Sequence, residues 1–117
     1  MKLSKVKEIL EAEVLAGEEM MDIEVDSAFG SDLMSDVLAF VNDRVMLLTG
    51  LVNPQVVRTA EMMDISAIVF VRGKRPDENV IALAKAKDIA ILTTSHTMYV
   101  ACGRLYCEGL TGDEKEV

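Results

Sequence analysis

The chain has 117 residues, half of them hydrophobic and 27% charged, which fits one domain with an ordinary core and excludes wholesale disorder or collagen-like repeats. Its formal net charge is −8, from 12 Lys and Arg against 20 Asp and Glu. Since a binder of phosphate backbones needs the opposite balance, we expect no nucleic acid partner. The acidic excess lies in residues 1–44, which carry a net charge of −7, whereas residues 45–117 are nearly neutral.

The first 44 residues predict two helices with a strand between them. A helix begins after Ser4, with Leu3 as its hydrophobic staple, and a short segment after it is closed by Gly17. The alternating residues 22–26 predict a half-exposed strand, and Ser31 suits the cap of the second helix. The expected inward positions are Val6, Ile9 and Leu10 in the first helix, and Leu33, Met34, Val37, Leu38 and Val41 in the second.

Three strand–loop–helix units follow from residue 45. Their strands, at 45–48, 67–71 and 89–92, are apolar throughout, which is typical of a parallel sheet covered by helices on both faces. The helix after the first strand has Asn53 as its cap and Pro54 at its first position. The expected inward positions of the three helices are Val56, Val57, Ala60 and Met63, then Val80, Ile81, Leu83 and Ala84, then Met98, Ala101, Cys102 and Leu105.

The predicted fold class is α/β, with βα units forming a mainly parallel sheet flanked by helices, an N-terminal helix and an extra edge strand. Residues 1–110 are expected to form a single domain and residues 111–117 a flexible acidic tail. The densest apolar stretch, residues 67–71, is too short to span a membrane, and acidic residues interrupt any signal-like segment. With two cysteines and no disulfide framework, we expect a cytoplasmic protein without membrane association.

Polar side chains gather in the strand-to-helix loops. In a parallel sheet these loops meet at the carboxyl edge of the strands, where helix N-termini favour anions. A basic cluster at residues 72–75 is notable in so acidic a chain. The loops therefore favour a nucleotide-like or phosphorylated small ligand, although no glycine-rich phosphate motif is present. The candidate ligand-binding residues are Thr49, Gly50, Asn53, Arg72, Gly73, Lys74, Arg75, Thr94 and Ser95.

Catalysis has little support in the sequence. His96 opens the last helix, where an exposed surface group is the ordinary interpretation, and no nucleophile–base motif accompanies it. Asp32 and Asp36 lie four residues apart on one expected helix face, with Asp43 further on, and could share a divalent cation. We therefore predict a non-enzymatic protein with no cofactor. The alternative is a small metal-assisted phosphotransfer or hydrolytic enzyme that uses Asp32, Asp36 and His96.

Residues of the last helix favour an interaction role. Gly103 permits close approach of a second backbone, and the eight methionines of the chain suit adaptable contacts. Cys102 falls on the apolar face and Cys107 diverges from it, so the two do not predict a disulfide. These features favour a homodimer, with an accessory subunit of a larger protein complex as the alternative.

Residues 30–41, 47–85 and 88–106 resemble a DRTGG domain, and the resemblance covers roughly residues 3–110. Similar domains lie between the CBS domains of some inorganic pyrophosphatases and in long phosphotransacetylases, with a more distant likeness in HPr kinase/phosphorylase. The resemblance implies an α/β accessory domain associated with regulation and dimerisation. This chain departs from the family pattern, because the loop 49–53 lacks the Asp-Arg pair and the next loop keeps only Gly73 of the Thr-Gly-Gly sequence.

Overall fold

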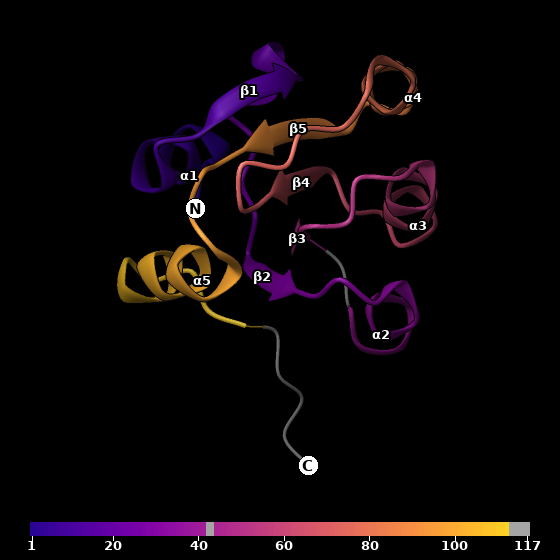
Figure 1. Ribbon diagram of the computed structural model, residues 1–117. Helices are drawn as coiled ribbons and strands as arrows, with labels where there is room; N and C mark the ends of the chain where they lie inside the picture. The colour runs from indigo at the N-terminus through magenta and orange to yellow at the C-terminus, as the bar shows by residue number, and fades with distance from the viewer. Residues whose placement is uncertain (42–43, 113–117) are drawn as a thin grey trace.

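Five strands form one sheet in the order β1-β5-β4-β3-β2 (Figure 1). The computed structural model describes residues 1–41 and 44–112. Strands β2 to β5 are parallel, whereas β1 runs antiparallel to β5 at one edge, so the expected mainly parallel sheet with an extra edge strand is confirmed. The strands are β1 (Glu13–Ala16), β2 (Ser27–Gly30), β3 (Val45–Thr49), β4 (Ala67–Phe70) and β5 (Ala90–Thr93).

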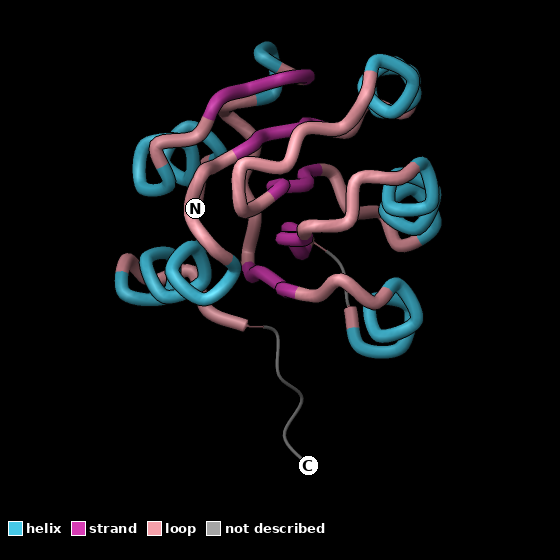
Figure 2. Tube along the Cα trace, in the orientation of Figure 1, coloured by secondary structure: helices cyan, strands magenta, loops and turns pink. Residues whose placement is uncertain are grey.

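Helices cover both faces of the sheet. Figure 2 shows α2, α3 and α4 stacked on one face, with α1 and α5 on the other. The short 3₁₀ helix η1 (Glu18–Met20) follows β1, and no described helix is both long and apolar enough to cross a membrane. The α-helices are α1 (Leu3–Leu10), α2 (Met34–Phe40), α3 (Pro54–Met62), α4 (Glu78–Ala86) and α5 (Met98–Cys107).

Each face of the sheet has its own apolar core. Because successive side chains of a strand point to opposite faces, the uniformly apolar strands supply both cores at once. On the face of α2, α3 and α4, the strands contribute Leu47, Ile68, Phe70 and Ile91. On the face of α1 and α5, they contribute Met46, Leu48, Val69 and Leu92.

The strand predicted at residues 22–26 is wrong. This segment makes only an isolated bridge between Glu24 and Lys2, and the strand that joins the sheet is β2, further along the chain. The backbone of the segment is bonded to the chain's N-terminus instead: the Leu3 N–H donates to Ile23 O, and the Val25 N–H donates to Met1 O. The alternating pattern therefore reflects a segment laid against the start of α1, with one side buried.

Several expected helix boundaries are also wrong. The first helix begins at Leu3, not after Ser4, and the second begins only at Met34, so Leu33 precedes it. Leu33 and Leu38 are both exposed rather than inward. The Ser31 hydroxyl accepts from the Leu33 N–H at 3.0 Å in a turn before the helix and caps nothing. In contrast, the cap at Asn53 is confirmed, because its side chain accepts from the Gln55 N–H at 3.0 Å.

The last described residues lie along the outer edge of β2. The side chain of Leu110 is buried, and the Ala28 N–H donates to the Thr111 carbonyl at 3.0 Å. Residues 113–117, which contain most of the predicted acidic tail, lie outside the described residues.

Candidate functional site

Three of the predicted loops begin at one edge of the sheet. Thr49 is paired with Phe70, and Phe70 with Thr93, so β3, β4 and β5 end level with one another. Gly50, Val71 and Thr94 follow these ends directly. The parallel register therefore places the loops side by side at the carboxyl edge, where ligands bind in open α/β sheets.

A carboxylate occupies the centre of this edge. Asp32 Oδ1 accepts from the Gly50 N–H at 2.7 Å and from the Thr49 hydroxyl at 3.2 Å, while Oδ2 lies 3.5 Å from Arg72 Nη1. The Gly50 N–H, helped by Thr49 and Arg72, holds the pKa of the Asp32 carboxyl below its ordinary value against the opposing effect of burial. We call these four residues the Asp32 cluster.

Gly50 lets the guanidinium of Arg72 approach the end of β3. A Cβ atom at position 50 would lie 2.1 Å from Arg72 Nη2, so any larger residue would displace the arginine side chain. The backbone of Arg72 is itself held in the left-handed region, at φ 59°, by N–H bonds from Arg72 to His96 O and from Gly73 to Thr94 O, each 2.8 Å long. The loops after β4 and β5 are thus joined by their backbones.

The basic cluster at residues 72–75 is divided by the fold. Arg72 points toward β3 and Asp32. In contrast, Arg75 pairs with Glu13 of β1, the edge strand at the other end of the sheet from β2. The hydrogen bond and charge of Arg75 lower the pKa of Glu13. The Lys74 carbonyl accepts from the Thr93 hydroxyl at 2.7 Å, and the residue is exposed. Arg72 is therefore the arginine that contributes to the centre of the edge.

Two of the other candidate residues, Asn53 and Thr94, have structural contacts, and the third is Ser95. Asn53 caps α3, as described above. The buried Thr94 hydroxyl donates to the Leu10 carbonyl at 2.7 Å and so joins the loop after β5 to the end of α1. Ser95 is exposed and does not cap α5, because the side chain of Thr97 accepts from the Val100 N–H.

The residues proposed for metal-assisted catalysis do not come together. Asp32 precedes α2, so it does not share a helix face with Asp36, and Asp43 lies outside the described residues. His96 lies before α5 rather than opening it; its side chain is only 20% exposed, with Nε2 3.5 Å from Glu11 Oε1. Across residues 1–41 and 44–112, no group of three His, Cys, Asp or Glu side chains could hold a metal ion.

Asp32 is the site residue whose position the sequence interpretation missed. The sequence pattern places Asp32 on a helix capped by Ser31, where it is a candidate metal ligand only. With β2 at Ser27–Gly30, Asp32 falls in a strand-to-helix loop at the same carboxyl edge as Gly50 and Arg72. The signal that could have found it is the short apolar pair Ala28-Phe29 directly before Gly30.

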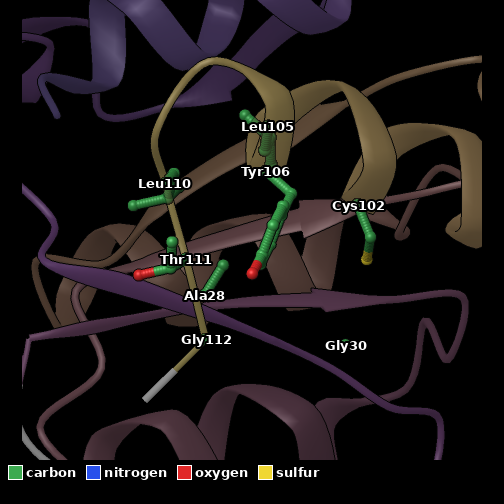
Figure 3. Close-up of a pocket in the computed structure, with 8 residues that line it drawn as sticks. All are labelled: Ala28, Gly30, Cys102, Leu105, Tyr106, Leu110, Thr111 and Gly112. Atoms are coloured by element: carbon green, nitrogen blue, oxygen red, sulfur yellow. The ribbon is translucent and has the colours of Figure 1, made fainter. Parts of the chain in front are cut away.

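A second surface feature lies on α5. Tyr99 and Tyr106 are 89% and 65% exposed, and a Cβ atom at Gly103 between them would meet nothing within 4 Å. In Figure 3, Tyr106 extends from α5 beside a pocket of about 250 Å³. Cys102 also lines this pocket, and partial burial raises the pKa of its thiol. The other lining residues are Ala28, Gly30, Leu105, Leu110, Thr111 and Gly112.

The fold and this edge define an α/β domain with a polar loop cluster at the ends of its parallel strands. The chain belongs to the DRTGG domain family, which it matches over residues 5–106. The structure is also similar to the CBS and DRTGG domains of the regulatory region of Clostridium perfringens pyrophosphatase, solved as a complex with the activator diadenosine tetraphosphate. That match has a TM-score of 0.74 and 21% identity over 96% of this chain, which spans 48% of the other. No curated protein matches this chain.

Proposed function

We propose that this chain is a non-catalytic regulatory domain that binds a nucleotide-like or phosphorylated small ligand at the carboxyl edge of β3, β4 and β5. The proposed compartment is the cytoplasm, where Cys102 and Cys107 remain free thiols. The observation that carries the proposal is the convergence of a backbone N–H, a hydroxyl and a guanidinium, from Gly50, Thr49 and Arg72, on one position.

These three donors form a set suited to an anionic oxygen. Charge-assisted hydrogen bonds are the strong ones, and arginine with backbone N–H groups is a recurring combination at phosphate sites. The Arg72 side chain is 44% exposed, so part of its guanidinium faces solvent. The solved relative was crystallised with diadenosine tetraphosphate, a polyphosphate joined to two nucleosides. Adenine nucleotides are therefore the first probes to use.

Arg72→Ala is expected to abolish most of the thermal stabilisation that ATP or diadenosine tetraphosphate gives the wild-type chain. A ligand at about 100 times its Kd stabilises a protein by about 2.7 kcal/mol, a shift of several degrees in Tm. Hydrogen bonds to charged groups contribute about 1.5–3 kcal/mol, so loss of the guanidinium should weaken binding at least about tenfold. Differential scanning fluorimetry with each nucleotide measures both effects.

Arg75→Ala is the matched control, because it removes the same charge from the same loop but from a side chain directed to Glu13. We expect it to leave the nucleotide-induced shift nearly unchanged. Equal loss in both variants would mean that only the overall charge matters. A wild-type chain that is not stabilised by either nucleotide at millimolar concentration would contradict the proposed ligand binding.

We also propose that the chain is a homodimer that uses the outward face of α5. Tyr99, Gly103 and Tyr106 are four and three residues apart, so they share one face of the helix. Large exposed aromatic side chains beside a glycine favour close packing against a second copy, since Tyr is enriched in interface cores. Symmetric dimers are the commonest assembly of soluble proteins.

Gly103→Glu is expected to convert the dimer into a monomer, because it places a charge where the two helices would meet. The variant should fold normally, since a Cβ atom at this position would meet nothing within 4 Å. Met62→Glu on α3, where Met62 is 71% exposed, is the control and should remain dimeric. Light scattering after size-exclusion chromatography at micromolar concentration distinguishes the two states. A wild-type monomer would contradict the proposal.

A further inference from the structure

We infer that Asp32 is a built-in competitor for the ligand site, so that an anionic group binds there only by displacing the Asp32 carboxylate. This inference rests on the proposed function, because it concerns the regulation and ligand charge of that same site. The reason is that the two oxygens of the Asp32 carboxylate already contact the Gly50 N–H and the Arg72 guanidinium. A ligand anion would need these same donors.

The donors come from separate parts of the chain and share one acceptor. Thr49 and Gly50 lie 17 and 18 residues from Asp32, at the end of the neighbouring strand β3, and Arg72 follows β4. Oδ1 receives two hydrogen bonds, including a short one of 2.7 Å from the Gly50 N–H. The carboxylate thus occupies the position of a bound anion, and its negative charge also repels any other anion nearby.

The carboxylate can leave this position without disturbing the fold. The Asp32 side chain is 49% exposed, so rotation would place it in water. The first backbone acceptor of α2 is Leu33 O, which receives the N–H groups of Asp36 and Val37, so the helix does not depend on the Asp32 side chain. Solvation of the released carboxylate offsets part of the cost of releasing it.

The competitor selects for ligand charge. A singly charged carboxylate on a ligand would only replace one carboxylate by another, whereas a phosphate group brings more charge and more acceptor oxygens. Phosphate and polyphosphate groups are therefore the class of ligand that this site favours over monoanions. The wild-type affinity is expected to be lower than the donor set alone would allow.

The test is a titration of the full chain and its Asp32→Asn variant with ATP and, separately, with inorganic pyrophosphate, by isothermal titration calorimetry. The asparagine keeps an oxygen that can accept from the Gly50 N–H but loses the negative charge. We expect the variant to bind both probes about tenfold more tightly than the wild type. Asp36→Asn is the matched control, because it removes the same charge from the first turn of α2, and its affinity should change less than twofold.

Each outcome separates this inference from the proposed function. If the wild type binds and Asp32→Asn binds equally or more weakly, Asp32 positions Arg72 rather than competing, and the inference alone falls. If Asp36→Asn tightens binding as much as Asp32→Asn, the effect is general charge repulsion and the inference also falls. If neither ATP nor pyrophosphate binds to the wild type or to either variant, both the inference and the proposed function fall. A melting curve checks folding, and Asp32→Ser replaces Asp32→Asn if that variant is unfolded.

Discussion

Phe70→Ala is expected to lower the free energy of unfolding by about 3–5 kcal/mol. Phe70 is fully buried at the end of β4 and is among the largest buried side chains, within the core formed with α2, α3 and α4. Its truncation would remove apolar contacts and leave a cavity that the flanking strands cannot close. Urea unfolding followed by circular dichroism measures the loss, which should appear as a lower midpoint with little change of slope.

The matched control is Phe40→Ala at the end of α2, where the same atoms are removed from a side chain that is 64% exposed. We expect that change to cost less than about 0.5 kcal/mol, as for most surface substitutions. Similar losses in the two variants would contradict the burial of Phe70 in the core between the sheet and α2, α3 and α4. Because Phe70 immediately precedes Val71 and Arg72, the core variant should also weaken ligand binding.

Gly17→Ala is expected to destabilise the chain by about 2–4 kcal/mol, through backbone conformation and close contact together. Gly17 joins β1 to η1 with φ +85°, a conformation that costs other residues about 1–2 kcal/mol. A Cβ atom there would also lie 2.9 Å from both Cα and Cβ of Ala90. Since one of these atoms belongs to the backbone of β5, the edge pairing of β1 would have to shift.

Gly109→Ala separates the two contributions. Gly109 also has a positive φ, +104°, but a Cβ atom there would meet nothing within 4 Å. We therefore expect only the conformational cost of about 1–2 kcal/mol in urea unfolding, with the remainder of the Gly17 effect due to the contact with β5. Equal losses in the two variants would show that β1 does not pack as closely on β5 as the structure indicates.

The Asp32 cluster gives the proposed regulation a simple physical basis. A ligand that displaces the Asp32 side chain would break its hydrogen bonds with Thr49 and Gly50 and its ion pair with Arg72. Asp32 lies between the edge strand β2 and α2. Helix α5 packs beside that strand on the other face of the sheet, as Figure 1 shows. Ligand binding and the proposed dimer contact would then lie on elements that flank the same strand, which offers a short route for coupling between them.

The sequence predicted the repeating part of the fold well. The strands β3, β4 and β5, the cap at Asn53 and the inward faces of α3 and α4 follow from local patterns, because apolar runs and capping residues act over a few neighbouring positions. Residues 22–26 alternate like a half-exposed strand but form none in the sheet, because an extended segment packed against a helix shows the same alternation. The strand is β2 at Ser27–Gly30, and the loop after it brings Asp32 to the carboxyl edge.

Local patterns are therefore enough to predict the α/β class, the parallel core strands and the set of loops able to meet at one edge. Which side chains meet there depends on how the strands are ordered in the folded chain. Arg72 and Arg75 are three residues apart, yet one is paired with Asp32 and the other with Glu13, 62 residues away in the chain. Such pairings depend on strand order and register, which local patterns do not specify. The position of the Asp32 carboxylate between Gly50 and Arg72 therefore follows from the folded structure and not from the local sequence.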